Sequence, residues 1–184
     1  MHRQLPNFIT FVRMVIAPLL AFLLWQTQTP VVALLAFGLF CLAGISDWLD
    51  GWLARRLNIV SSVGRMLDPI ADKLLIAACI LALAAQRGPD ALFLVPALVI
   101  LFREFLVSGL REYLAGSKIT VPATMAAKWK TAVQMIAVGC LILPPVLQNY
   151  MPVEQLGLGL LWLAALMTVH TGLSYFHASR AHFN

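Results

Sequence analysis

The sequence is poor in charged residues. Only 11% of its 184 residues are Asp, Glu, Lys or Arg, whereas a soluble domain carries about a quarter. Apolar residues make up 61% of the chain. So little polar surface cannot cover a water-soluble globule, and the composition therefore predicts an integral membrane protein. No cleavable signal peptide is expected, because no small-residue cleavage site follows the first apolar run.

Cysteine is also scarce. Cys41, Cys79 and Cys140 each lie in an apolar run. An odd number at such positions argues against a disulfide framework, and the lack of a C-x-x-C pair argues against a thiolate zinc site. The net charge of +5 is modest, and its distribution along the chain is more informative than its sum. We expect no nucleic-acid partner.

The apolar residues fall into six segments separated by turn-type residues. Each approaches the length of about 20 residues that a helix needs to cross a bilayer. Asp68-Pro69 suits the start of the third helix, and Pro144-Pro145 suits a kink or the end of the fifth. The sequence predicts one all-α transmembrane domain over residues 1–184, with six transmembrane helices at 8–25, 31–54, 69–86, 92–115, 129–147 and 155–176.

Basic residues gather at alternate breaks between these segments. Arg55 and Arg65 flank the second break, Lys118 and Lys128 lie near the fourth, and the intervening breaks contain only Arg87. By the positive-inside rule, both termini and the second and fourth loops then face the cytoplasm.

Four aspartates dominate the polar residues. They belong to the frame D-x-x-D-G-x-x-A-R-(x8)-G-x-x-x-D-x-x-x-D and are Asp47, Asp50, Asp68 and Asp72. At helical spacing, each pair lies on one helix face. Oxygen ligands without Cys or His favour Mg²⁺ or Mn²⁺, and two such ions would relieve the repulsion among four carboxylates and bind a pyrophosphate. A lone aspartate near a helix end is usually an interface residue, but that alternative does not explain four in this spacing.

This frame is identified as the signature of the CDP-alcohol phosphotransferase family, which the sequence matches at every specified position. The resemblance implies a six-helix membrane fold, a homodimer, and a reaction in which an alcohol hydroxyl displaces CMP from a CDP-linked lipid. It implies that Asp47, Asp50 and Asp68 are metal ligands and that Asp72 is both a ligand and the general base. It further implies contacts to the nucleotide and its phosphates from Gly51, Arg55 and Ser61.

Segments that flank the signature indicate which alcohol is the acceptor. Residues 6–13, 68–73, 102–112 and 128–134 resemble the corresponding segments of bacterial phosphatidylglycerophosphate synthases, with Ala127 standing where those proteins usually have Gly. The resemblance implies CDP-diacylglycerol and glycerol 3-phosphate as substrates, phosphatidylglycerophosphate and CMP as products, and a bacterial inner membrane as the location. It also places Asn7 and Thr10 among the contacts to the CDP-lipid.

An anionic acceptor agrees with the cations on the predicted cytoplasmic side. Arg103, Arg111, Lys128 and Lys130 are candidates to bind the phosphate of glycerol 3-phosphate. Two alternatives stay open: Arg103 forms a structural ion pair with Glu104, or the lysines only anchor the protein to lipid head groups.

Two other functions compete with this interpretation. One is an enzyme of the same family that uses inositol phosphate, serine or a second phosphatidylglycerol as acceptor. The other is a cation transporter, which would place its carboxylates near the middle of the membrane. The aspartates here instead cluster at cytoplasmic helix ends, beside Arg and Lys residues that would repel a cation.

Overall fold

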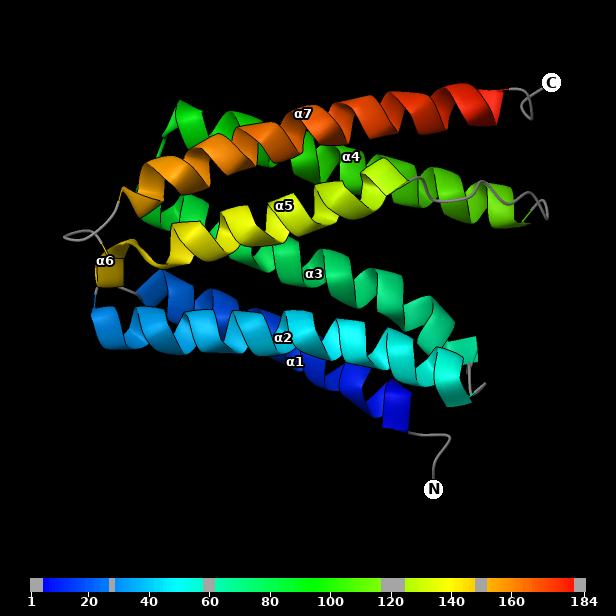
Figure 1. The fold of residues 1–184 in the computed structure, drawn as a ribbon, viewed down its shortest axis with the longest axis horizontal. Coiled ribbons are helices and arrows are strands. Elements are labelled where there is room, and N and C mark those ends of the chain that lie inside the picture. The colour runs from blue at the N-terminus through cyan, green and yellow to red at the C-terminus, as the bar shows by residue number, and fades with distance from the viewer. Residues whose placement is uncertain (1–4, 27–28, 58–61, 117–124, 148–151, 181–184) are drawn as a thin grey trace. The chain divides into compact units, whose positions relative to one another are not determined.

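The fold is a set of helices joined by short connections (Figure 1). The computed structural model describes residues 5–26, 29–57, 62–116, 125–147 and 152–180, with the side chains at 5–9, 47–57, 62–66, 178 and 180 left undescribed. No strand occurs within these ranges, so the predicted all-α class is confirmed. The helices are α1 Leu5–Gln26, α2 Pro30–Leu57, α3 Ser62–Arg87, α4 Ala91–Gly116, α5 Met125–Ile142, α6 Pro144–Leu147 and α7 Val153–Arg180.

Each predicted segment contains a helix, with two differences in bounds. The third helix begins at Ser62, so Asp68-Pro69 lies inside α3 and not at its start. A proline inside a helix removes a single backbone hydrogen bond, so the helix can extend to the N-terminal side of Pro69. The fifth segment is divided, because α5 ends at Ile142 and the Pro144-Pro145 pair begins α6.

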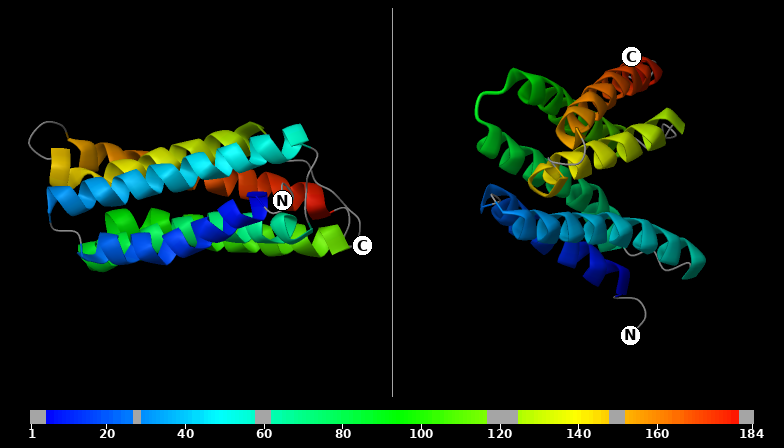
Figure 2. Two further views of the ribbon diagram at one scale, coloured as in Figure 1. Left: turned by 90° about the horizontal axis from the view of Figure 1, so that it is seen from below. Right: turned by 60° about the vertical axis from the view of Figure 1, so that its left-hand side comes forward.

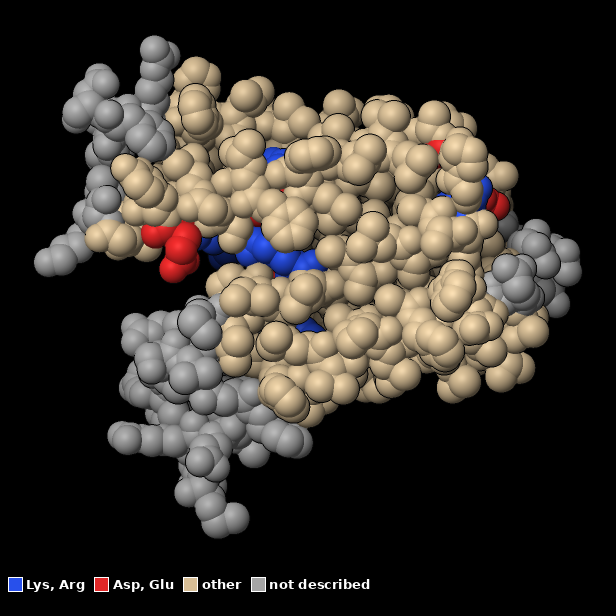
Figure 3. All heavy atoms as spheres, turned by 180° about the vertical axis from the view of Figure 1, so that it is seen from behind, with Lys and Arg blue, Asp and Glu red and all other residues tan. Residues whose placement is uncertain are grey.

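The apolar surface agrees with a membrane protein. Phe22, Leu81 and Phe102 expose 55%, 63% and 73% of their surface, and few charged side chains are visible on the face drawn in Figure 3. Among the described residues, two helices are long and apolar enough to cross a membrane, Ala91–Gly116 and Val153–His177. The apolar stretches Thr10–Gln26 and Pro30–Ser46 are shorter. Six crossings therefore remain a prediction.

The chain divides into two compact units. Unit 1 comprises Met1–Gly88 and Leu141–Val153, and unit 2 comprises Pro89–Cys140 and Glu154–Asn184. In unit 1, α1 packs against both α2 and α3, and α2 contacts α6 (Figures 1 and 2). Unit 2 contains α4, α7 and nearly all of α5.

In unit 1, the buried stripe of α1 is polar at one end and apolar at the other. It consists of Thr10, Arg13, Ala17, Leu20 and Leu24, spaced alternately three and four residues apart as in a core-facing helix. Polar contacts join α1 to α3 at both ends of this stripe. At the polar end, Thr10 and Arg13 donate hydrogen bonds to α3. At the apolar end, the Gln86 side chain donates a hydrogen bond to the Leu24 carbonyl. The two helices run in the same direction.

In unit 2, a proline inside α4 removes one hydrogen bond of that helix, and a side chain of α7 replaces it. Pro96 lies inside α4 and has no N–H to donate to the carbonyl four residues earlier, that of Leu92. The indole Nε1 of Trp162 donates to this carbonyl at 2.9 Å. A backbone acceptor that the helix cannot satisfy is thereby satisfied by a neighbouring helix, as an apolar environment requires.

Replacing Trp162 by phenylalanine should therefore lower stability by roughly 0.5 to 1 kcal/mol, the contribution of one hydrogen bond in a membrane protein. Thermal unfolding of the purified protein in detergent measures this change. Trp129→Phe is the matched control, because Trp129 is 64% exposed and should tolerate the exchange. Equal destabilisation by both variants would show that ring size, and not the indole hydrogen bond, matters at Trp162.

Candidate active site

Two buried side chains of α1 hold the two aspartates of α3. Thr10 Oγ1 donates to Asp68 Oδ1 at 2.6 Å, and Arg13 Nη1 donates to Asp72 Oδ1 at 2.8 Å. The pairs match because both spacings, three residues on α1 and four on α3, correspond to about one helical turn. The Arg13 side chain is 1% exposed, whereas that of Asp72 is 52% exposed. The carboxylates are thus oriented from the protein side and Asp72 stays accessible.

Arg13 is a functional candidate to which the sequence interpretation assigned no role. The charge-assisted hydrogen bond from its guanidinium fixes the Asp72 carboxylate more firmly than a neutral donor would. The available signal was the spacing of Thr10 and Arg13, three residues, which like the four-residue spacing of Asp68 and Asp72 is close to one helical turn.

The other residues predicted for the nucleotide and metal site are placed only in part. The backbones of Asp47, Asp50, Gly51 and Arg55 belong to α2, and that of Asn7 belongs to α1, but their side chains lie outside the described part of the structure. Ser61 lies outside the described residues altogether. Of the predicted set, the structure brings together Thr10, Asp68 and Asp72.

The donor chemistry of the described carboxylates suits a hard divalent cation. Asp68 and Asp72 present carboxylate oxygens one helical turn apart on α3, held by Thr10 and Arg13, and such oxygen donors suit Mg²⁺ or Mn²⁺. The residues with described side chains include no group of three or more His, Cys, Asp or Glu that could hold a metal ion. A complete site would need the carboxylates of α2 as well.

Unit 2 contains a separate cluster of charged side chains. Glu104 of α4 accepts a hydrogen bond from Lys130 of α5 and one of 3.3 Å from Arg103. Arg103 also donates to Thr171 Oγ1 on α7 at 2.9 Å. Lys130 is 4% exposed, so it lies inside the unit and not among lipid head groups. The Arg103–Glu104 ion pair considered as an alternative is present. Two cations share one carboxylate, which leaves the trio with a net positive charge.

The other two candidate cations are exposed. The Arg111 guanidinium lies 5.7 Å from the centroid of the Tyr175 ring, a cation–π contact that leaves its N–H groups available. Lys128 lies near the start of α5 and is exposed as well. Arg111 and Lys128 can therefore reach a ligand in solution more directly than Arg103 and Lys130 can.

A glycine makes room for Arg103. A Cβ atom at Gly172 of α7 would lie 3.1 Å from Arg103 Cγ and 3.2 Å from its Nε, closer than ordinary van der Waals contact. The absence of a side chain at this position lets the arginine lie flat against α7, where Thr171 accepts its hydrogen bond. Gly172 is thus a part of the cation cluster that the sequence interpretation did not identify.

These features define an α-helical membrane protein with an acidic centre in one unit and a cationic cluster in the other. The sequence pattern of the CDP-alcohol phosphatidyltransferase family matches residues 3–170, and the chain belongs to this family.

Its relatives resemble it along nearly their whole length. The chain is 44% identical over 180 residues to a CDP-diacylglycerol–glycerol-3-phosphate 3-phosphatidyltransferase of Rickettsia bellii, with 98% of this chain and 97% of that protein covered. Proteins with the same name from Shigella flexneri and Cereibacter sphaeroides are 35% and 34% identical to it. The coverage is 98% of this chain and 97% of the Shigella protein, and 96% and 95% for the Cereibacter protein.

The Gly172 contact gives a test of the cation cluster. Gly172→Ala should destabilise the protein because the new methyl group displaces Arg103, and overpacking of this kind costs about 1 to 3 kcal/mol. Gly159→Ala, on the same helix, meets nothing within 4 Å and should gain up to about 1 kcal/mol from helix propensity. Thermal unfolding of both variants in detergent measures the difference. Identical behaviour would mean that Arg103 moves aside at no cost.

Proposed function

We propose that this chain transfers the phosphatidyl group of CDP-diacylglycerol to glycerol 3-phosphate, releasing CMP and phosphatidylglycerophosphate. The structural observation that carries the proposal is the pair of oriented aspartates on α3, held by Thr10 and Arg13 of α1. They are the last two positions of the family signature. The names of the relatives, which match along nearly the entire chain, support this donor and this acceptor.

In the proposed reaction, an acceptor hydroxyl oxygen attacks the phosphorus that carries the diacylglycerol group. The bond from this phosphorus to the bridging pyrophosphate oxygen breaks, and CMP leaves with the electron pair. Asp72 takes the hydroxyl proton, for which its exposure and its fixed orientation suit it. Asp47, Asp50, Asp68 and Asp72 would hold two Mg²⁺ or Mn²⁺ ions, which would stabilise the negative charge of the pyrophosphate.

The remaining residues have proposed roles in binding. Arg55 pairs with a phosphate of the donor, and Gly51 allows the cytidine part to approach α2 closely. Asn7, Thr10 and Ser61 complete the contacts to the CDP-lipid.

The acceptor phosphate is held by unit 2. Arg111 and Lys128, which are exposed, contact it directly. The more buried Arg103 and Lys130 add positive potential, because their one shared carboxylate does not neutralise both.

We further propose the setting of the enzyme. It is a multi-pass protein of a bacterial inner membrane, with six crossings, surrounded by membrane lipid. Both termini and the site face the cytoplasm, and residues 1–184 act as one catalytic domain in a homodimer. The exposed apolar residues and the alternation of basic loops support this arrangement.

An acceptor panel tests the function. Purified protein is given CDP-diacylglycerol with glycerol 3-phosphate, glycerol, serine or inositol phosphate, and CMP and lipid products are measured with the divalent cation present and after chelation. We expect product with glycerol 3-phosphate alone and no turnover after chelation. Preferential use of serine or inositol phosphate would identify a different member of the family. Cation uptake into proteoliposomes without CMP release would favour a transporter.

Asp72→Asn tests the general base. The amide keeps one oxygen for a cation but cannot accept the proton, so single-turnover CMP release should fall about a hundred- to ten-thousand-fold while affinity for CDP-diacylglycerol changes little. Asp90→Asn is the matched control, since Asp90 Oδ1 accepts a hydrogen bond from the Leu92 N–H at the start of α4 and Asn caps equally well. Lost affinity with a normal rate per bound donor would make Asp72 a ligand only.

A further inference from the structure

The guanidinium of Arg103 is held by two helices of unit 2. Its Nη1 donates to Glu104 Oε1 on α4 at 3.3 Å, and its Nη2 donates to Thr171 Oγ1 on α7 at 2.9 Å. The side chain lies against Gly172, where a Cβ atom would crowd it. The shorter of the two hydrogen bonds thus comes from α7. Because a guanidinium is a planar fork, fixing both terminal nitrogens fixes the orientation of the whole group.

The Thr171 hydroxyl is set up as an acceptor for Arg103. Its Oγ1 donates within α7, to the Met167 carbonyl at 2.8 Å and less closely to the Thr168 carbonyl at 3.2 Å. A hydroxyl has one proton to donate and two lone pairs that accept, so a lone pair is left for the arginine. Thr171 is 5% exposed, which shields the contact from water. A neutral oxygen therefore orients the cation without cancelling its charge.

The carboxylate of Glu104 is a different kind of partner. Arg103 and Lys130 both contact its Oε1 atom, and each contact offsets part of a positive charge. Among the described residues, Glu104 and Thr171 are the hydrogen-bond partners of Arg103, whose buried Nε has none. Removing the Thr171 oxygen would leave the carboxylate as the one anchor. The arginine would then move toward Glu104, and less of its charge would act on a nearby phosphate.

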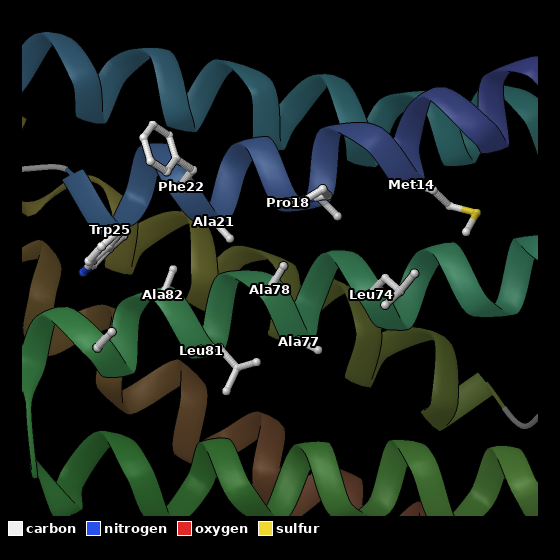
Figure 4. A pocket seen from close by; sticks show the side chains of 12 residues that line it. Met14, Pro18, Ala21, Phe22, Trp25, Leu74, Ala77, Ala78, Leu81 and Ala82 are labelled. Atoms are coloured by element: carbon white, nitrogen blue, oxygen red, sulfur yellow. The ribbon is translucent and has the colours of Figure 1, made fainter.

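The pocket drawn in Figure 4, which α1 and α3 line in unit 1, offers an anion nothing comparable. None of its twelve lining residues is charged, and Met14, Phe22 and Leu81 are typical of them. A phosphate placed there would lose its hydration without gaining a cation. Unit 2 is therefore where contacts to the acceptor phosphate are expected.

We infer that Thr171 of α7 is a positioning residue for the acceptor phosphate. It holds the guanidinium of Arg103 through a neutral oxygen, so the cation keeps a fixed orientation and its full charge. This inference rests on the proposed function, in which Arg103 and Lys130 supply positive potential at that phosphate. It makes α7 one of the helices that determine the affinity for the acceptor.

Replacing Thr171 by valine tests the inference. Valine has nearly the same shape but lacks the oxygen, so the KM for glycerol 3-phosphate should rise about three- to tenfold, while kcat and the KM for CDP-diacylglycerol change less than about twofold. Steady-state assays of purified protein, with each substrate varied while the other is saturating, measure this split. Thr171→Ser keeps the oxygen and should return both KM values to near those of the wild type. If valine prevents folding, Thr171→Ala removes the same oxygen.

Thr168→Val is the matched control. Thr168 lies three residues earlier on α7 and is 0% exposed, and its Oγ1 has no hydrogen-bond partner among the described residues. Losing this oxygen should leave both KM values unchanged. Both valine variants remove a buried hydroxyl from the same helix, so a general loosening of α7 would affect them alike.

Three results would overturn the inference. They are equal rises of both KM values in Thr171→Val, equal behaviour of Thr171→Val and Thr168→Val, or a serine variant as impaired as the valine variant. Each would mean that Thr171 serves only the packing of α7, and the proposed function would stand, because the wild-type protein would still form phosphatidylglycerophosphate. A wild-type protein that forms none would overturn the proposed function itself.

Discussion

The hydrogen bonds from α1 to the carboxylates of α3 fix both the candidate site and the packing of unit 1. Thr10 and Arg13 are buried, and each orients one aspartate. A buried arginine needs a partner of opposite charge, since its desolvation is otherwise uncompensated. The same bonds help to set the register of α1 against α3. Orientation of the carboxylates and alignment of the two helices thus depend on one set of contacts.

Unit 2 follows the same physical plan with the charges reversed. Its partly buried carboxylate, Glu104, is shared by Lys130 and Arg103, and the excess positive charge lies among helices that are otherwise apolar. Thr171 accepts a further hydrogen bond from Arg103, and Gly172 provides the space for it. Charges in such surroundings are weakly screened, so a small excess of one sign produces a strong local potential. In both units, helices that are mostly apolar become polar over part of their length.

The helices and the aspartate frame could be predicted from the sequence because their signals are local. The apolar runs predicted every long helix. The four-residue spacing of Asp68 and Asp72 predicted that they share one helix face. The partner of Arg13 could not be predicted, because it is 59 residues away and depends on how two helices are aligned. The start of α3 was missed because Pro69 reads locally as a helix start.

The separation between Arg13 and Asp72 also affects how the chain is made. Arg13 leaves the ribosome well before its partner, which is synthesised 59 residues later. The contact between them forms only when α3 is in place. The carboxylate proposed to accept the proton is therefore oriented only after the first three helices have been made and α1 has packed against α3.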